Sequence, residues 1–393
     1  MQQATTPTEG GICPAAIGPI SRRMLMAGGA GLVSATALSA RPAQAQGNPP
    51  SAVLPIQAPV RQDWLDKRHE EIIEPDLPII DPHHHLWDRP GYRYLFPELL
   101  ADVGSGHNIR ATCYEQAREM YRADGPEELK SLGETQFVSG VSAMSASGKY
   151  GPTRCITGII GFVDLRLGSR AKGILERHIA ISDGRLRGIR NGSTWSDDPT
   201  LKTFTADGPP GLLLDGSFRE GFAALAPLGL TFDAWMFQTQ LEDLVDLARA
   251  FPQTTIVLNH CGGPLAMRGP YAGKREEAFT EWRDRIRAIA SLPNTYVKLG
   301  GLGMKPIGFT FFENEQPPSS QDLEKAWRPY LETCITAFGP QRAMFESNFP
   351  VDKGTCSYQV LWNAFKRIAA GHAADEKTAL FSGAAAKAYR LEI

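Results

Sequence analysis

Two histidines spaced two residues apart stand in IDPHHHLW, residues 80–87. Residues i and i+2 of a β-strand point to the same face, so we expect His83 and His85 to project together and His84 to project away from them. Two imidazoles placed in this way can chelate a borderline metal ion such as Zn²⁺. The alternative is a polar strand end whose histidines are only hydrogen-bonded.

A further histidine follows a second apolar run, in IVLNHCGGP, residues 256–264. His260 leaves the predicted strand where a Gly-Gly-Pro turn begins, which is where a third metal ligand or an acid–base group would meet the first two. A lone histidine can equally be structural. We interpret the neighbouring Cys261 as a buried thiol, because the sequence offers it no obvious acidic orienting partner.

The elements that would position these side chains alternate along the chain. From Leu77 onward, short apolar runs alternate with longer amphipathic runs, which is the pattern of parallel strands joined by helices. Eight such units predict an α/β fold, a (β/α)8 TIM barrel with its chemistry at the C-terminal ends of the strands. The alternative, an open doubly wound sheet, lacks a glycine fingerprint after its first strand. The predicted strands are 79–86, 109–115, 156–164, 186–191, 231–237, 255–259, 296–300 and 343–346.

The helices between the strands are clearest at 217–228, 241–251, 275–292, 321–338 and 358–370, with a tail at 376–389. In residues 241–251 the apolar positions form the stripe of a helix that lies on a sheet, and Pro252 ends it. After the seventh strand, the glycines of KLGGLGM, residues 298–304, predict a mobile rim.

Three motifs together resemble the amidohydrolase superfamily. Asp-x-His-x-His on the first strand, Asn-His-Cys-Gly-Gly-Pro on the sixth and Ser-Asn-Phe-Pro on the eighth are similar to the amidohydrolase-related family (family 2) that contains 2-pyrone-4,6-dicarboxylate lactonase and L-fuconolactonase. The resemblance covers about residues 77–391. It implies a hydrolase that activates water to open a lactone or a related cyclic ester or amide. It also implies that His83, His85 and His260 bind metal or polarise the substrate.

The chain departs from the family pattern on the eighth strand. Where the pattern has Ser-Asp-Trp-Pro with a water-activating aspartate, this chain has Asn348, and an amide cannot accept a proton at neutral pH. Asp352 is the nearest carboxylate that could turn into the mouth, while Glu346 and Asp81 are other candidates for the base. A loop-capping role for Asp352 is the alternative. The expected catalytic residues are therefore Asp352, Asn348 and His260.

Substrate-binding candidates lie near other predicted strand ends. Arg190, after the fourth strand, could grip a carboxylate with two parallel hydrogen bonds, or form a barrel-mouth salt bridge. Glu115, Gln238 and Trp87 are further candidates. Superfamily members with two metals bridge them with a strand-four lysine or glutamate, and strand four here offers neither. The resemblance therefore implies one divalent ion, Zn²⁺ or Mn²⁺, or a metal-independent site.

Two other functions stay open at this point. Related barrels with similar histidines carry out nonoxidative decarboxylation of aromatic or unsaturated acids. A noncatalytic periplasmic ligand-binding barrel would explain the missing aspartate at Asn348. In each case the partner is a small molecule.

The composition is that of an ordinary globular protein of 393 residues, 42% hydrophobic and 21% charged. With 41 basic and 43 acidic side chains and no Lys/Arg block, we expect no nucleic-acid partner. Six cysteines are too few for a disulfide scaffold. A homo-oligomer is left open.

The first 45 residues predict an export signal. Arg22 and Arg23 precede an apolar run at 24–40, and Ala43-Gln44-Ala45 forms a small-x-small cleavage site, as in a Tat-type signal peptide. A membrane anchor is the alternative, but the run is short for one. We therefore expect a periplasmic protein with no stable membrane anchor after cleavage. Residues 46–76 would form a flexible leader into one domain, 77–393.

Overall fold

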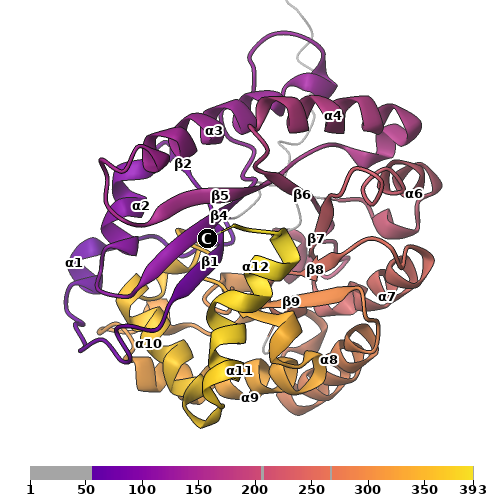
Figure 1. The fold of residues 1–393 in the computed structure, drawn as a ribbon. Coiled ribbons are helices and arrows are strands. Elements are labelled where there is room, and N and C mark those ends of the chain that lie inside the picture. Colours follow the sequence, from indigo (N-terminus) through magenta and orange to yellow (C-terminus); the bar gives the residue numbers. More distant parts are fainter. Residues whose placement is uncertain (1–54, 205–207, 266–267, 393) are drawn as a thin grey trace, which may run out of the picture. The chain divides into compact units, whose positions relative to one another are not determined.

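Eight parallel strands form one closed sheet in the computed structural model, which describes residues 55–204, 208–265 and 268–392 (Figure 1). The sheet closes where Asn348 N–H donates to His83 O at 2.9 Å and His85 N–H donates to Phe349 O at 2.7 Å. The predicted (β/α)8 barrel is confirmed. In sheet order, the strands are β1 (Ile79–His84), β4 (Ile109–Glu115), β5 (Arg154–Gly161), β6 (Leu186–Gly192), β7 (Thr231–Trp235), β8 (Ile256–Leu258), β9 (Thr295–Leu299) and β10 (Ala343–Phe345).

All eight predicted strands are present, but several are shorter at their C-terminal ends than predicted. β7 ends at Trp235, although Met236 and Phe237 continue the apolar run. Both side chains are fully buried outside the ladder, so loop packing rather than strand pairing accounts for their hydrophobicity. The apolar pattern therefore locates the strands better than it locates their ends.

Helices surround the sheet (Figure 1). The predicted helices are present with shifted ends, whereas α3 and α4 were not among the clearest predictions. The sequence of α3, LGETQFVSGVSAMSA, carries small and polar residues on all sides, so it shows little helical periodicity. The helices are α2 (Phe96–Val103), α3 (Leu132–Ala146), α4 (Ala171–Ile181), α5 (Pro199–Lys202), α6 (Gly216–Phe222), α7 (Leu241–Ala250), α8 (Arg275–Ala290), α9 (Ser320–Phe338) and α10 (Tyr358–Ile368).

The C-terminal tail closes one end of the barrel. α11 (Ala374–Thr378) leads through a π-helical turn at Ala379–Gly383 into α12 (Ala384–Tyr389), which lies across the strands in Figure 1. Small residues of α12 pack on strand residues such as Ile80 and Val257 in a separate apolar cluster. Chemistry is therefore confined to the opposite, C-terminal end of the strands.

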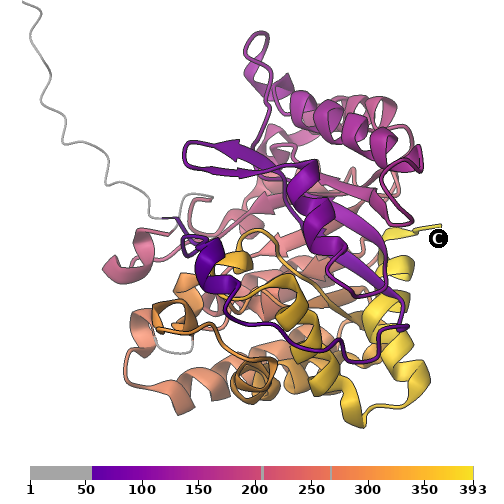
Figure 2. The same cartoon turned by 90° about the vertical axis from the view of Figure 1, so that its left-hand side faces the viewer.

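Two features near the mouth were not predicted. An antiparallel hairpin of β2 (Trp87–Arg89) and β3 (Tyr92–Tyr94) projects after β1 (Figure 2). Residues 55–76, which include α1 (Gln62–Leu65), pack on the barrel. Trp64 is 3% exposed, and its indole N–H donates to Asn314 O at 3.1 Å. Burial of this aromatic side chain fixes the segment in place.

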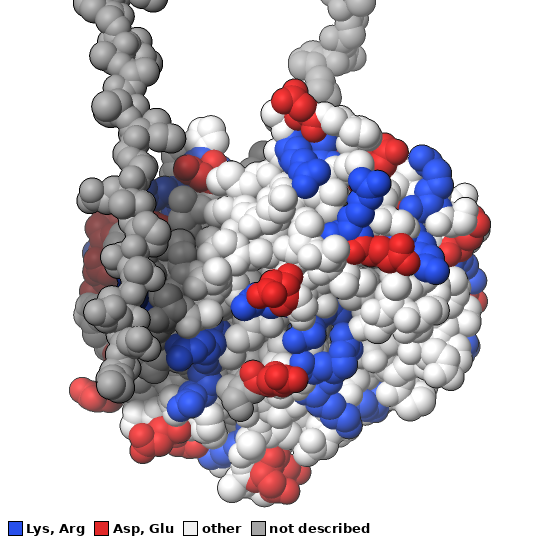
Figure 3. Space-filling view, turned by 45° about the horizontal axis from the view of Figure 1, so that its top comes forward, with Lys and Arg blue, Asp and Glu red and all other residues white. Residues whose placement is uncertain are grey.

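The predicted signal segment, residues 1–45, lies outside the described residues. Within residues 55–204, 208–265 and 268–392, no helix is both long and apolar enough to span a membrane. On the face drawn in Figure 3, basic and acidic side chains are interspersed.

Candidate active site

Three imidazoles from two distant parts of the chain converge inside the barrel. The ring centroids of His83 and His85 lie 4.9 Å apart, and those of His83 and His260 lie 4.6 Å apart. The Nε2 atoms of His83 and His85 are separated by 3.2 Å. His84 points away, with Nε2 2.8 Å from Thr112 Oγ1. The orientations predicted from strand spacing are therefore correct for His83, His84 and His85.

Asp81 ties the first strand to the loop after β10. Its carboxylate accepts hydrogen bonds from the Ser347 N–H at 2.9 Å, the Ser347 hydroxyl at 2.6 Å and the Tyr358 hydroxyl at 3.0 Å. Burial raises the pKa of Asp81 to about 6, against the lowering effect of these donors. With three donors in place, Asp81 is an anchor of the β1–β10 junction and a poor candidate for the general base.

Glu346 lies between two of the imidazoles. Its Oε1 is 2.7 Å from Nδ1 of His260 and accepts the His260 backbone N–H at 3.1 Å, while its Oε2 is 2.8 Å from Nδ1 of His83. Burial raises the pKa of this carboxyl to about 8, although Lys298 and the His260 N–H lower it. Sequence reasoning named Glu346 among candidate bases, but its position between the histidines depends on the closed barrel.

A second layer of charge lies beneath the histidines and was missed in the sequence. Lys298 on β9 is fully buried, with Nζ 2.9 Å from Glu115 Oε2, 2.7 Å from Asp233 Oδ2 and 3.2 Å from His83 Nδ1. Burial alone would lower the pKa of the Lys298 ammonium, but Asp233, Glu115 and Glu346 together raise it above its ordinary value. A signal existed: Asp233 in TFDAW and Lys298 in TYVKL are charged residues within otherwise buried strands.

Two predicted substrate-binding residues, Arg190 and Glu115, join this cluster. Arg190 Nη1 is 3.4 Å from His83 Nε2, its Nε is 3.3 Å from Glu115 Oε1, and its Nη2 donates to Gln116 O at 2.6 Å. The salt bridge expected as the alternative for Arg190 therefore exists. Since guanidinium carries five N–H groups, donors remain for a ligand.

Burial and nearby cations keep the imidazoles neutral. The pKa of His83 is lowered well below 6.5 by burial and then by Lys298, and that of His260 by burial, Arg190 and Lys298. Neutral imidazole has one nitrogen with a free lone pair. Each ring therefore offers a lone pair to a cation or a hydrogen-bond donor, while the lowered pKa opposes its protonation at neutral pH.

The aromatic candidate Trp87 lies beside the cluster. Its ring stacks on His85 with centroids 5.9 Å apart and planes inclined by 20°. The Arg89 guanidinium lies over the Trp87 ring, with its central carbon 4.2 Å from the ring centroid. Trp87 thus forms a wall next to His85, and its role toward a substrate stays a prediction.

Gln238 lies apart from the imidazoles in the contacts of the described residues. Its Nε2 donates to Ala278 O at 3.1 Å, and its Oε1 accepts from the Leu265 N–H at 2.7 Å. The amide therefore links the backbone of α8 to the loop at Leu265, and a substrate-binding role stays a prediction.

Two of the expected catalytic residues, Asn348 and Asp352, pair with each other. Asn348 Nδ2 donates to Asp352 Oδ1 at 3.0 Å, and the Gly303 N–H donates to Asp352 Oδ2 at 3.2 Å. Burial raises the pKa of Asp352 to about 8, and Glu346 adds to this, whereas the two donors oppose it. Asp352 thus holds the loop after β9, which is the capping alternative, and its catalytic role stays a prediction.

The glycine-rich stretch after β9 is buried, which differs from the mobile rim predicted for it. A Cβ on Gly300 would lie 2.5 Å from Glu346 atoms, and a Cβ on Gly301 would lie 2.4 Å from His260 Nδ1. Glycine is needed here because the backbone passes directly over the active side chains, and Gly301 also has φ of 68°.

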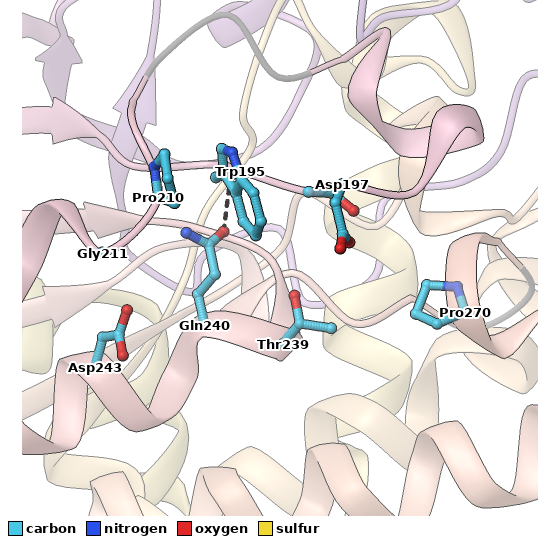
Figure 4. A pocket seen from close by; sticks show the side chains of 9 residues that line it. Trp195, Asp197, Pro210, Gly211, Thr239, Gln240, Asp243 and Pro270 are labelled. Carbon is cyan, nitrogen blue, oxygen red and sulfur yellow. Dashed lines mark hydrogen bonds between the residues drawn. The ribbon is translucent and has the colours of Figure 1, made fainter.

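A cavity of about 210 Å³ opens on the β6–β8 side of the mouth (Figure 4). Trp195 and Gln240 line it, and the Gln240 Oε1 accepts the Trp195 N–H at 2.9 Å. Trp235 on β7 lies beside the histidine cluster, with its ring centroid 4.8 Å from that of His260.

The donor set suits a single divalent cation. His85 Nδ1 lies 2.8 Å from Glu115 O, so it carries the proton and leaves the lone pair of Nε2 directed toward His83. The Nε2 separation of 3.2 Å is close to the spacing of about 3.3 Å between two nitrogens on one tetrahedral zinc. His83, His260 and Glu346 also place one donor atom each within 4.8 Å of one another.

The buried carboxyl groups of the cluster also favour a bound cation. Glu346 Oε2 is buried without a hydrogen-bond partner among the described residues, because its approach to His83 has the distance but not the angle of a hydrogen bond. When all are ionised, the carboxyl groups of Glu115, Asp233 and Glu346 exceed the cations Lys298 and Arg190 by one, and burial accordingly raises the pKa values of Glu115 and Glu346 to about 8. An excess of buried negative charge favours a bound cation or proton.

Comparisons with known proteins agree with this site. The chain is 32% identical over 338 residues to an uncharacterised protein of Sinorhizobium fredii, covering 80% of this chain and 99% of that relative. It is 27% identical over 323 residues to an L-fucono-1,5-lactonase of Burkholderia multivorans, covering 79% of this chain and 96% of that enzyme. A crystal structure of a Burkholderia multivorans amidohydrolase with bound zinc has 26% identity and a TM-score of 0.60, covering 80% of this chain and 99% of that one.

The family model for amidohydrolases (Amidohydro_2) matches residues 80–391, from the strand that carries His83 and His85 to the end of the C-terminal tail. With the barrel, the converging histidines and this match, the chain belongs to the amidohydrolase family 2.

Proposed function

We propose that the protein is a hydrolase that opens a lactone, or a related cyclic ester or amide, of a small carboxylated substrate. The observation that carries the proposal is the Glu346–His260 pair, with Oε1 2.7 Å from Nδ1, set beside the Arg190 cation in the mouth of the barrel. Similarity to L-fucono-1,5-lactonase supports the choice of a lactone.

Exposure identifies which groups would meet the substrate. Arg190 is 8% exposed, His85 4% and His260 2%, whereas His83, Glu346 and Lys298 are at 0%. The substrate would therefore contact the guanidinium and the two outer imidazoles, with the remaining groups behind them. Arg190 suits the carboxylate of the substrate or its carbonyl oxygen, since its free N–H groups can bind either.

His260 is the general base in this proposal. A carboxylate at Nδ1 directs the lone pair of Nε2 away from Glu346 and stabilises the imidazolium that forms on proton uptake. His260 takes a proton from water as the water oxygen bonds to the carbonyl carbon. The ring C–O bond then breaks, and the alkoxide receives that proton, so the product is a hydroxy acid.

Asp352 is the alternative base, and its hydrogen bonds to Asn348 and Gly303 would have to open first. A water positioned by Asn348 could then give its proton to Asp352. Replacing each candidate base separately decides between them.

A divalent ion, Zn²⁺ or Mn²⁺, would be held by His83 and His85 with Glu346, or with His260 in the alternative where Asp352 is the base. When bound, it would supply a Lewis acid that polarises the carbonyl. The zinc in the Burkholderia multivorans amidohydrolase supports this assignment.

The test is a panel of sugar lactones, carboxylated lactones and aromatic carboxylic acids, with acid release and CO₂ release measured in parallel. We expect acid release from lactones and its loss in His260→Asn. Release of CO₂ from aromatic acids would instead support the decarboxylase alternative. If every compound is inert while some still raise the melting temperature, the protein is a ligand-binding barrel.

We further propose export through the twin-arginine route, with periplasmic localisation and no retained membrane anchor. The support is the Arg22-Arg23 pair, the apolar run and the cleavage site in the sequence. Replacing both arginines by lysine should leave the uncleaved precursor in the cytoplasm, as cell fractionation would detect. A wild-type chain found uncleaved in membranes would contradict the proposal.

A further inference from the structure

We propose that the ammonium of Lys298 occupies a second cation position, between Glu115 and Asp233, and thereby limits the barrel to one divalent ion. Removing this lysine should open that position to an ion such as Mn²⁺. The inference rests on the proposed metal site for the first ion, whereas the carboxylates Glu115 and Asp233 belong to the second position alone.

The surroundings of Lys298 resemble a coordination site. Its Nζ has acceptors on three sides, at 2.9 Å in Glu115, 2.7 Å in Asp233 and 3.2 Å in His83. The two carboxylate contacts are ion pairs in which the ammonium donates. All four side chains are fully buried, so water cannot replace any of the contacts. The two carboxylate oxygens are also the kind of ligand that suits a divalent ion such as Mn²⁺.

The carboxylates would keep their places without the lysine. Asp233 Oδ2 also accepts from Asn259 Nδ2 at 2.9 Å and from the Tyr389 hydroxyl at 2.8 Å. Glu115 Oε1 is held in an ion pair at 3.3 Å by Arg190. These anchors come from β6, from the end of β8 and from α12, none of which depends on Lys298. The position is therefore preorganised by its neighbours.

Charge explains why the position must be filled. Two buried carboxylates that face one gap repel each other unless a cation lies between them, and removal of one member of a buried ion pair is strongly destabilising. Tyr389 and Asn259 are neutral donors and cannot supply that charge. With Lys298 present the need is met, and a divalent ion in the same gap would collide with the ammonium.

The test compares bound metal in four proteins, namely wild type, Lys298→Ala, Lys298→Arg and the double variant Lys298→Ala with Asp233→Asn. Each is equilibrated with Mn²⁺, separated from free ion by gel filtration and analysed for manganese per chain. We expect Lys298→Ala to bind one ion more than wild type. Lys298→Arg keeps the cation and the double variant loses the carboxylate pair, so neither should gain an ion.

The melting temperature with and without Mn²⁺ provides the second readout. We expect Mn²⁺ to raise the melting temperature of Lys298→Ala more than that of wild type or the double variant. An unchanged manganese content in Lys298→Ala would overturn the proposal. So would a Lys298→Ala protein that is insoluble both with and without Mn²⁺ while the double variant folds.

This outcome is separable from the proposed function. The measured quantity is the difference in manganese between variant and wild type, and no substrate is involved. A wild-type protein without lactonase activity would refute the reaction but leave the second position to be counted. Equal manganese in both proteins would refute the second position while leaving the reaction intact.

Discussion

Glu346 Oε1 lies 2.7 Å from Nδ1 of His260 and also accepts the backbone N–H of the same residue at 3.1 Å. This double contact fixes the ring and the backbone of His260 relative to the carboxylate. Glu346 precedes Asn348 by two residues on the eighth strand, where the family pattern has its aspartate at the later position. The barrel thus places a carboxylate at the end of this strand, in direct contact with an imidazole.

Replacement of Glu346 by Gln should lower kcat by about 10²- to 10⁴-fold, the usual contribution of a general base, with KM changed only a few-fold. The amide has no charge to stabilise a protonated His260. Steady-state kinetics on the best lactone measures the effect. Glu313→Gln, the same change at an exposed position, is the control and should leave kcat unaltered. A normal kcat in Glu346→Gln would show that His260 acts without this carboxylate.

Two glycines with similar positive φ allow the effect of a steric clash to be distinguished from the effect of backbone strain. Gly301 has φ of 68° and a Cβ there would lie 2.4 Å from His260, whereas Gly273 has φ of 76° and nothing within 4 Å. Backbone strain from alanine at either site should cost about 1 kcal/mol in the free energy of unfolding, and Gly301→Ala adds the cost of its clash with His260. Only Gly301→Ala should also lose activity, by about 10²-fold, because a small displacement of a reacting group has that effect. Equal activity in both variants would mean that His260 tolerates displacement.

The sequence predicted those features that depend on local spacing. The orientation of His83, His84 and His85 follows from strand geometry alone, and the eight strands follow from apolar periodicity. The position of His260 follows from a strand end at the same face of the barrel. These are short-range properties that the closure of the barrel merely brings together.

Features that depend on closure itself were not predicted. Lys298 and Asp233 meet at 2.7 Å across the barrel from strands 65 residues apart in sequence. The local sequence pattern does not show whether a charged residue in a strand pairs with a counter-ion or faces solvent. Gly301 is a second example. Its lack of a side chain suggested a mobile segment, whereas in the structure glycine is needed because the backbone packs closely against His260. The packing of Trp64 also depends on a distant part of the chain, because its indole N–H donates to Asn314 O.

Arg190 should discriminate between charged and neutral substrates. Arg190→Met removes the cation that would bind a substrate carboxylate, and charged hydrogen bonds contribute about 1.5–3 kcal/mol. We therefore expect KM to rise about 10- to 100-fold for carboxylated lactones and less for neutral sugar lactones. Parallel kinetics with both classes provides the comparison. If KM rises equally for both, Arg190 serves mainly to hold Glu115 and the Gln116 carbonyl.

For the proposed metal site, His84 provides a matched control beside His83 and His85. Dialysis against a chelator should reduce activity at least about 10²-fold, with recovery on addition of Zn²⁺ or Mn²⁺. His83→Gln and His85→Gln should lose the bound ion, whereas His84→Gln should retain it, because His84 faces Thr112. Elemental analysis of the three variants gives the result. Full activity after complete metal removal would assign the histidines to direct polarisation of the substrate.

The ionisation of Asp352 should make stability depend on pH. Burial, reinforced by Glu346, raises its pKa from 3.8 to about 8 in the folded chain. A carboxyl with a raised pKa favours the folded state when protonated, so its contribution is complete below pH 4 and is lost as the pH rises through about 8. Each unit of pKa corresponds to about 1.4 kcal/mol, which makes the loss several kcal/mol at most.

Asp352→Asn removes this titration while keeping the shape of the side chain. The free energy of unfolding of the variant relative to wild type should therefore increase between pH 5 and 8 and level off above pH 8, as urea titrations at pH 5, 7 and 9 would measure. Other buried carboxyls titrate in both proteins, so the difference isolates Asp352. A difference that is constant with pH would mean that Asp352 is ionised throughout this range.

Activity of the same variant decides between the two bases, because a loss beyond about 10²-fold would transfer the role from His260 to Asp352.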